Sequence, residues 1–227
     1  MKVAKPIYNI TPFTLLDYPD KTACIFWFAG CNMRCVYCYN PNIVLEKGKL
    51  TIDQAINFIE KRKGLLDAVV LSGGECTGYK GIINLAEKIK KHNMLVKIDT
   101  NGSRPDVIEK LINKNCIDYV ALDLKGLDDT FLKITKSKLN KKFDETLKIL
   151  INSKIPFEIR TTFHSDLLSV NEIEEMAEYI YQIGYRGTYY LQNYLANTPT
   201  LGKIKNESLK LKREDLKVEN MNIVIRN

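Results

Sequence analysis

The sequence TACIFWFAGCNMRCVYCYNP, residues 22–41, combines an apolar run with a cluster of cysteines and indicates the fold class. Residues 22–28 are almost continuously apolar, which is typical of a strand covered on both faces. Cys31, Cys35 and Cys38 follow, with three and two residues between them. The stretch therefore predicts a buried parallel strand that carries a cysteine-rich loop at its carboxyl end.

Strand and helix patterns alternate along the rest of the chain, which favours parallel β/α units. Thr51 followed by Gln54 has the spacing of a capping box and predicts the start of one helix. The other predicted strands are residues 68–71, 95–99, 118–124, 157–162 and 189–192. A closed eight-unit barrel needs roughly 250 residues, so six units predict an α/β fold with a parallel sheet, an open partial (β/α)6 TIM-like barrel.

The length of 227 residues favours a single domain spanning residues 1–227, with a core at about residues 20–194. Within a C-terminal tail of residues 203–227, residues 203–219 are rich in Lys and Glu and are expected to form a solvated connection. Residues 221–226 have the pattern of a short strand or a docking tail. We found no internal repeat and no low-complexity linker.

The segment MKVAKPIYNI, residues 1–10, does not read as a secretory signal, and no apolar run reaches the roughly 18 residues of a membrane span. We therefore expect a cytoplasmic protein with reduced cysteines and no membrane contact. The net charge of +7 is compatible with an acidic protein partner, with a nucleic acid, or simply with a solvated lysine-rich surface. No nucleic-acid-binding motif favours the second alternative.

Three thiolates on one loop can hold a [4Fe–4S] cluster and leave one iron open to an exogenous ligand. A structural zinc ion instead needs four protein ligands, and none is adjacent to this loop. The alternative is a zinc-binding interaction module with Cys24 or Cys76 as the fourth ligand. Cys24, Cys76 and Cys116 are scattered, so no auxiliary cluster is expected.

Polar residues end the predicted strands, and the carboxyl ends of parallel strands meet on one face of a barrel. They are Gly73, Gly74 and Glu75, then Asp99 and Thr100, then Asp123 and Lys125, then Arg160, and finally Gln192. Several have ordinary alternatives. The Gly-Gly-Glu sequence is common in turns, Asp99 or Asn101 could cap a helix, and Arg160 or His164 could be purely structural.

The CxxxCxxC motif, with Tyr37 before its third cysteine, resembles the signature of the radical S-adenosylmethionine (SAM) superfamily. The resemblance implies that Cys31, Cys35 and Cys38 hold a [4Fe–4S] cluster whose open iron chelates SAM. It also implies that the Gly73–Glu75 motif binds the methionine amino group. The expected cofactor-binding residues are Tyr37, Tyr39, Asn40, Gly73, Gly74, Glu75, Asp99, Thr100, Asp123, Lys125, Arg160 and Gln192.

The block FTLLDYPDK, residues 13–21, together with the cysteine loop resembles one branch. This branch is the short-type anaerobic ribonucleoside-triphosphate reductase activating proteins of the glycyl-radical-enzyme activating family. The resemblance covers most of residues 11–194. Two positions depart from it, because Tyr39 stands where histidine is common and Cys76 stands where proline is usual.

The resemblance implies an enzyme that reductively cleaves SAM to a 5′-deoxyadenosyl radical. That radical would then generate a glycyl radical on a partner, anaerobic ribonucleotide reductase. A flavodoxin-like or ferredoxin electron donor would supply the electron. In the pyruvate formate-lyase activating branch, equivalents of Asp99, Thr100 and Asp123 also hold a monovalent cation.

A second enzymatic interpretation is a small-molecule radical SAM enzyme similar to 7-carboxy-7-deazaguanine synthases. The zinc-binding module is the non-enzymatic interpretation. Iron content and SAM cleavage separate the zinc-binding module from the two radical interpretations, and a glycyl-radical signal on the partner separates these two from each other.

Overall fold

The computed structural model describes residues 3–226, which form a single eight-stranded sheet in the order β1 to β8. Strand β1 runs antiparallel to β2, and every later neighbour in the sheet is parallel. The strands are β1 (Ile7–Thr14), β2 (Ala23–Phe28), β3 (Ala68–Gly73), β4 (Leu95–Thr100), β5 (Tyr119–Asp123), β6 (Phe157–Phe163), β7 (Tyr189–Asn193) and β8 (Ile223–Arg226).

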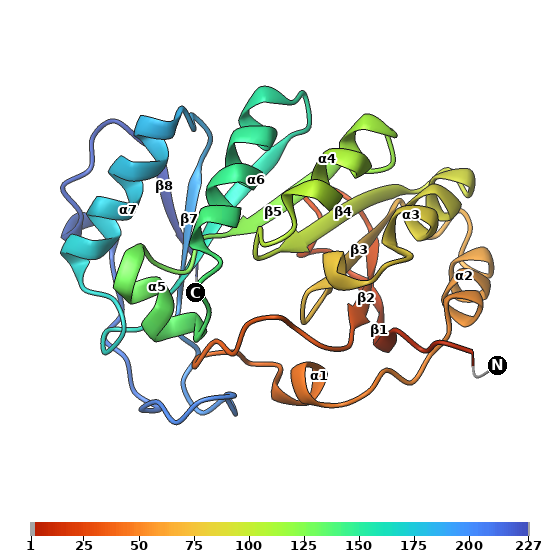
Figure 1. Cartoon of the computed structure of the whole chain (residues 1–227), viewed down its shortest axis with the longest axis horizontal. Helices are drawn as coiled ribbons and strands as arrows, with labels where there is room; N and C mark the ends of the chain where they lie inside the picture. Colours follow the sequence, from red (N-terminus) through yellow and green to blue (C-terminus); the bar gives the residue numbers. More distant parts are fainter. Residues whose placement is uncertain (1–2, 227) are drawn as a thin grey trace.

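Helices connect the parallel strands and cover the outer side of the curved sheet (Figure 1). They are α1 (Pro41–Leu45), α2 (Ile52–Glu60), α3 (Ile82–Lys91), α4 (Pro105–Asn113), α5 (Asp128–Thr135), α6 (Asn140–Asn152) and α7 (Val170–Ile183). Two short 3-10 turns, η1 (Cys76–Gly78) and η2 (Arg213–Asp215), complete the set in the described residues. Helix α1 and the cysteine loop before it lie apart from this outer layer (Figure 1).

The six predicted strands are confirmed as β2 to β7, and the sheet stays open as expected. Strand β1 was not predicted, because Pro12 and polar residues break its apolar pattern. Two register shifts interrupt its pairing with β2, which is tolerated at a sheet edge. Of the two interpretations of residues 221–226, the short strand is confirmed, since Ile223–Arg226 form β8 and pair with β7.

Local sequence explains where two of the helices begin. Thr51 and Gln54 form the predicted capping box at α2, and Ser169 and Glu172 form a second one at α7. In each box the side chains satisfy backbone amides that the first helical turn leaves without partners. Gly184 then ends α7 in the left-handed conformation at φ 113°, which glycine adopts without steric cost.

Two apolar clusters hold the layers together. The larger one lies between the sheet and the helices and includes Phe26, Leu71, Ile98 and most apolar residues of α3, α4, α6 and α7. The smaller one groups Tyr18 with short apolar side chains of β2 and β3. Tyr18 belongs to the segment after β1, and its ring centroid lies 5.8 Å from that of Tyr119. The sequence block at residues 13–21 therefore packs against β5.

The expectation of a solvated connection at residues 203–219 is wrong in part. The segment contains only one short 3-10 turn, but Leu211, Leu216 and Val218 are buried against the main core. Lysine and glutamate dominate its composition and mask these three apolar anchors in the sequence.

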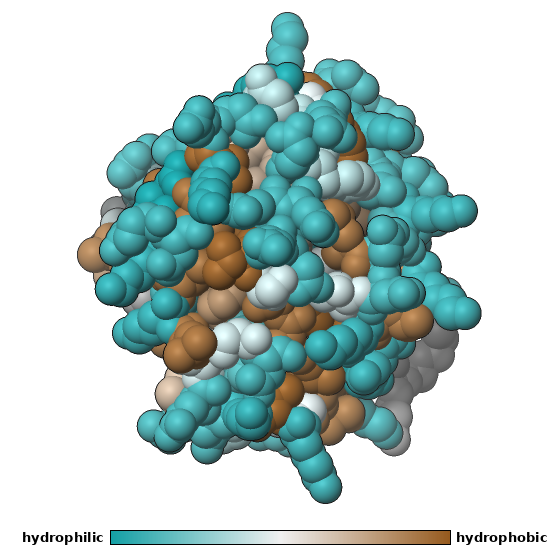
Figure 2. Space-filling view, turned by 90° about the vertical axis from the view of Figure 1, so that its left-hand side faces the viewer, coloured by the Kyte–Doolittle hydropathy of each residue, from teal (hydrophilic) through white to brown (hydrophobic). Residues whose placement is uncertain are grey.

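On the face shown in Figure 2, hydrophilic residues predominate and apolar side chains show between them.

Within residues 3–226, no helix has both the length and the apolar composition of a membrane span.

Candidate active site

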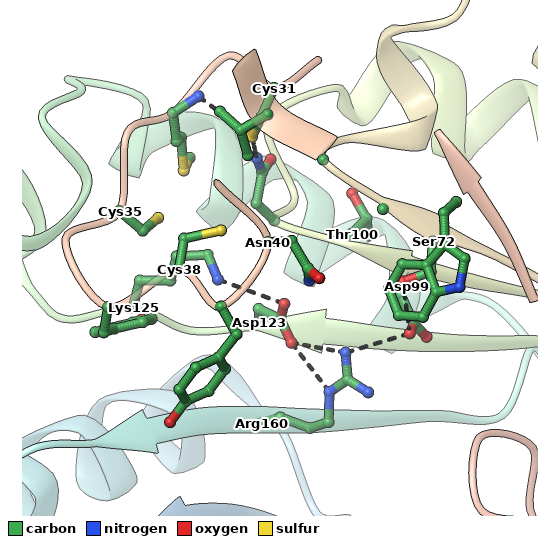
Figure 3. Close-up of a pocket in the computed structure, with 18 residues that line it drawn as sticks. Cys31, Cys35, Cys38, Asn40, Ser72, Asp99, Thr100, Asp123, Lys125 and Arg160 are labelled. Atoms are coloured by element: carbon green, nitrogen blue, oxygen red, sulfur yellow. Dashed lines mark hydrogen bonds and ion pairs between the residues drawn. The ribbon is translucent and has the colours of Figure 1, made fainter. Parts of the chain in front are cut away.

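A cavity of ≈ 200 Å³ lies at the carboxyl ends of the parallel strands, where the cysteine loop faces β3 to β6 (Figure 3). This is the face at which barrels of this kind place their functional groups. The predicted residues that line it are Cys31, Cys35, Tyr37, Cys38, Tyr39, Asn40, Gly73, Gly74, Asp99, Thr100, Asp123, Lys125 and Arg160. The fold therefore gathers side chains that are up to 129 positions apart in the sequence, from Cys31 to Arg160.

Backbone hydrogen bonds fasten the cysteine loop from two sides. The amides of Arg34 and Val36 donate to the carbonyl oxygens of Thr135 and Ile134 at 2.8 and 3.0 Å, at the end of α5. From the other side, the amides of residues 201 and 202 donate to the carbonyl oxygens of Cys38 and Val36 at 3.0 and 2.9 Å. The loop conformation is therefore imposed by distant parts of the chain as well as by its own sequence.

The three loop thiols surround the cavity instead of converging on one point. No three His, Cys, Asp or Glu side chains within residues 3–226 are close enough together to hold a single metal ion. Burial raises the pKa of the Cys31 thiol to about 12. Soft sulfur donors spaced around a cavity suit a polynuclear iron–sulfur cluster, which supplies several metal atoms to bind.

The two cysteines considered as a fourth zinc ligand lie elsewhere. Cys24 is fully buried in the core between the sheet and the helices. Cys76 is also fully buried, and its thiol donates to the carbonyl oxygens of Leu71 and Asp99 at 3.3 and 3.5 Å. Neither lines the cavity, so the donor set on the loop is three thiols.

The Gly73–Gly74 turn approaches the cysteine loop so closely that no side chain fits. Gly73 has φ +120°, and a Cβ there would lie 2.3 Å from the backbone nitrogen of Phe28. A Cβ on Gly74 would lie 1.9 Å from the carbonyl oxygen of Gly30. Both glycines line the cavity, so they bring bare backbone to its wall.

Glu75 is not among the residues that line this cavity, although Thr100 and Asn101, which bond to its carboxylate, are. Its Oε1 accepts hydrogen bonds from the Thr77 amide and hydroxyl and from the Thr100 hydroxyl, and its Oε2 accepts one from the Asn101 amide. Burial outweighs these bonds and raises the pKa of the carboxyl group above its ordinary value. The side chain joins the ends of β3 and β4, and it borders a second cavity of ≈ 440 Å³ behind Cys31.

Charged side chains of opposite sign alternate along one wall of the cavity. The Arg160 guanidinium lies 2.9 Å from Asp123 and 3.7 Å from Asp99 (Figure 3). Lys97, buried inside the sheet, pairs with Asp99 at 2.9 Å, and Lys125 pairs with Asp123 at 3.4 Å. Among the residues that line the cavity, the two cations Lys125 and Arg160 balance the two carboxylates Asp99 and Asp123, while Lys97 lies behind the wall.

These pairs hold the side chains in their charged forms. Burial alone would raise the pKa of Asp123, but Arg160 and Lys125 reverse the effect and the pKa lies below its ordinary value. Burial likewise opposes the charged form of Lys125, yet Asp123 and the neighbouring Tyr37 and cysteines raise its pKa well above the ordinary lysine value. The cavity therefore presents permanent charges near neutral pH.

Some sequence expectations fall outside the cavity. Gln192 is not among the lining residues, because the cavity is built on strands up to β6 and Gln192 lies on β7 beside Arg226. Neither Asp99 nor Asn101 caps a helix, since α4 begins after Arg104. His164 is fully buried, and its two ring nitrogens bond to the Lys205 carbonyl oxygen and the Asp166 amide, so its role is structural.

Sequence reasoning missed several residues of the site. Trp27, Met33, Val44, Ser72 and Asn101 also line the cavity. Ser72 donates to Asp99 at 3.2 Å, and the Trp27 ring nitrogen donates to Thr11 at 2.8 Å. Ser72 directly precedes the two glycines. Trp27 lies two positions after Ile25 on β2, and the two side chains belong to the same apolar cluster. Strand alternation could therefore have identified both.

Comparisons with known sequences agree with this geometry. Residues 25–180 match the Radical SAM superfamily. A protein of Methanocaldococcus jannaschii assigned as a glycyl-radical enzyme activating enzyme is 35% identical over 179 residues, which cover 76% of this chain and 74% of that protein. The pyruvate formate-lyase-activating enzyme of Clostridium pasteurianum is 29% identical over 185 residues, covering 78% of this chain and 76% of that enzyme.

Solved structures share the fold at lower identity. Streptococcus suis SuiB bound to S-adenosylmethionine superposes with a TM-score of 0.69 at 17% identity over 89% of this chain and 49% of SuiB. The protein anSMEcpe with bound AdoMet superposes with a TM-score of 0.60 at 18% identity over 74% of this chain and 48% of its own. The chain thus spans about half the length of these two proteins.

Enzymes of the matched superfamily use a [4Fe–4S] cluster and SAM, and the loop, the glycine turn and the charged strand ends are arranged around one cavity. The protein is therefore a radical SAM enzyme and belongs to the family of glycyl-radical enzyme activating enzymes.

Proposed function

We propose that Cys31, Cys35 and Cys38 ligate a [4Fe–4S] cluster and that SAM occupies the adjoining cavity. The observation that carries this proposal is that the three thiols and the Gly73–Gly74 turn line one cavity together with the charged ends of β4 to β6. When bound, the cluster supplies one electron to SAM, which yields methionine and a 5′-deoxyadenosyl radical. The residues of this chain bind SAM and orient it for that reaction.

The methionine part of SAM carries an ammonium group and a carboxylate, and each has a suitable partner in the cavity. The backbone of Gly73 and Gly74 is free of side chains and offers carbonyl oxygens to the ammonium group. Lys125 and Arg160 are the two cations that line the cavity and are the candidates for the carboxylate. Tyr37, Tyr39 and Asn40 complete the wall beside the third cysteine. The Glu75 side chain contributes by holding the glycine turn in place.

The residues present do not favour a monovalent cation beside Asp99 and Asp123. The Arg160 guanidinium already lies between the two carboxylates, and Lys97 and Lys125 pair with their remaining oxygens. The Thr100 hydroxyl donates to Glu75. We therefore assign no role in SAM binding to such a cation. The Arg160 guanidinium occupies the position between Asp99 and Asp123 that the cation would take.

The substrate we propose is a glycine of a partner protein, anaerobic ribonucleoside-triphosphate reductase. The sequence block at residues 13–21 and the cysteine loop support this partner by their resemblance to its activating proteins. The radical would remove a hydrogen atom from the glycine Cα and leave a glycyl radical. An acidic flavodoxin-like or ferredoxin donor suits the net charge of +7, and a reducing cytoplasm suits the free cysteines.

The test is to mix the anaerobically reconstituted enzyme and SAM with the anaerobic ribonucleotide reductase of the same organism. A doublet glycyl-radical signal in electron paramagnetic resonance is the expected result. Cleavage of SAM without that signal would contradict the partner and favour a small-molecule substrate. A colourless protein that holds one zinc ion would contradict the radical function itself.

A further inference from the structure

Three hydrogen bonds close a ring between the cysteine loop and the segment after β4. The side-chain nitrogen Nδ2 of Asn101 donates to Oδ1 of Asn32 at 3.0 Å. Nδ2 of Asn32 donates to the hydroxyl of Ser103 at 2.7 Å, and the Ser103 amide donates back to Oδ1 of Asn101 at 3.0 Å. The ring ties the residue next to Cys31 to the strand end that carries Asp99.

Asn101 is the fixed member of this ring. Its side chain is buried, with 5% of the residue exposed, and its own backbone amide donates to the Glu75 carboxylate at 2.8 Å. Asn32, by contrast, is exposed. The orientation of the Asn101 amide is therefore set by β4 and Glu75, and the loop adjusts to it.

The same amide group reaches the first cysteine. Nδ2 of Asn101 lies 3.9 Å from Sγ of Cys31, and the backbone nitrogen of Met33 lies 3.4 Å from that sulfur. An amide nitrogen carries two hydrogens, and Asn32 accepts only one of them. The second is available to Cys31. Within residues 3–226, no side chain donates a hydrogen bond to Sγ of Cys35 or Cys38.

We propose that Asn101 acts through Cys31 as a positioning residue that raises the reduction potential of the cluster. This inference rests on the cluster assignment of the proposed function. Hydrogen bonds to cluster sulfurs are among the factors that set the potential, because a donor stabilises the negative charge added on reduction. The groups that orient a metal ligand commonly change metal affinity or activity by 10–100-fold when they are replaced.

The informative variant is Asn101→Asp. An aspartate still accepts the bond from the Ser103 amide, and Asn32 can turn its own amide to donate to the new carboxylate. The ring survives in this way, while the donor toward Cys31 is replaced by a negative oxygen. Asn101→Ala removes both the ring and the donor. Asn42→Ala, an exposed position in α1, is the matched control.

The measurement is a redox titration of the reconstituted cluster, followed by electron paramagnetic resonance of its reduced form without SAM or partner. We expect Asn101→Asp to lower the equilibrium constant for one-electron reduction at least tenfold, a fall of about 59 mV. Asn101→Ala should show a smaller fall, and Asn42→Ala none.

A purely structural role predicts the opposite order, with Asn101→Asp close to the parent and Asn101→Ala disturbed. That order, or an unchanged potential in both variants with full iron content, would overturn the inference. Thermal unfolding of each iron-free variant shows whether the fold itself has suffered. If the parent protein assembles no cluster, it is the proposed function that fails, and the two failures are thereby distinguished.

Discussion

The backbone amide of Glu75 donates a 2.9 Å hydrogen bond to the carbonyl oxygen of Gly30, the residue directly before Cys31. The amide of Gly30 in turn donates to Ile43 in α1 at 2.8 Å. The glycine turn after β3 and the cysteine loop after β2 are thus joined backbone to backbone. A change in one of them has to move the other.

Gly74→Ala should disrupt this junction. The new Cβ would lie 1.9 Å from the carbonyl oxygen of Gly30. The position of a Cβ and that of a carbonyl oxygen are both set by the backbone, so a rotamer change cannot relieve the strain. We expect a loss of at least about 1–3 kcal/mol in the free energy of unfolding, together with weaker SAM binding. Chemical denaturation and anaerobic calorimetric titration measure the two effects.

Gly78→Ala is the control for that experiment. It lies four residues further along the same turn, has no positive φ, and a Cβ there meets nothing within 4 Å. Its stability should equal or exceed that of the parent by up to about 1 kcal/mol. Equal behaviour of the two alanine variants would show that the contact between the two backbones does not matter.

Replacing Cys31, Cys35 or Cys38 with alanine should in each case abolish the cluster. A site with three thiolates has no spare ligand, so iron should fall from about four per chain to a small residue. Iron analysis and visible absorption after anaerobic reconstitution provide the measurement. Cys116→Ala is the comparison, because Cys116 is buried next to α4 and far from the loop, and it should retain the full iron content.

Glu75→Gln should destabilise the fold and also change its pH dependence. Glutamine offers one acceptor oxygen where the carboxylate offers two, so a buried donor such as the Asn101 amide loses its partner, at a cost of about 1–3 kcal/mol. In the parent, the folded state holds the Glu75 proton to higher pH than the unfolded state does. Stability should therefore fall as pH rises from about 4.3, the ordinary glutamate value, through the raised pKa.

Denaturant titrations of both proteins at several pH values test this. The glutamine variant should lack the parent's decline in that acidic range. A parallel decline in both proteins would assign it to another group.

SAM affinity should be nearly constant between about pH 5 and pH 7, below the range in which the α-amino group of SAM itself loses its proton. The pKa of Asp123 is lowered. The contribution of its ionised form is therefore complete above the ordinary aspartate pKa and is lost only as pH falls through the lowered pKa. Lys125 has a raised pKa, so its contribution is complete below the ordinary lysine value and is lost only as pH rises through the raised one.

Asp123→Asn should change the pH dependence of SAM affinity, because the variant leaves Arg160 and Lys125 without their shared carboxylate. We expect the variant to lose about 1–3 kcal/mol of stability. Calorimetric titration with SAM at several pH values measures the affinity of the parent and of the variant. A strong pH dependence in the parent would show that these charges do not stay fixed.

Much of the fold could be predicted because parallel strands buried on both faces have continuous apolar runs, as in residues 22–28. The cysteine spacing and the polar strand ends also identified most of the cavity wall. The antiparallel strand β1 escaped prediction because an edge strand needs neither an apolar run nor the absence of proline, and Pro12 lies within it.

Sequence spacing does not encode the direction of a side chain or the distance between strands. Glu75 follows two cavity glycines in sequence, yet its carboxylate accepts four hydrogen bonds at the ends of β3 and β4 and borders the second cavity. Gln192 lies near the carboxyl end of β7, one strand beyond Arg160 on β6, and is not among the residues that line the cavity. Asn101 was considered only as a helix cap, and its bond to Asn32 spans 69 residues.

The bonds from residues 201 and 202 to the cysteine loop have a consequence for the order of events during synthesis. The ligand loop is translated more than 160 residues before the segment that closes it. Until then, the carbonyl oxygens of Val36 and Cys38 lack these partners. A growing chain thus fastens this side of the ligand loop only after strands β1 to β7 have been translated, whereas the bonds to residues 134 and 135 can form earlier.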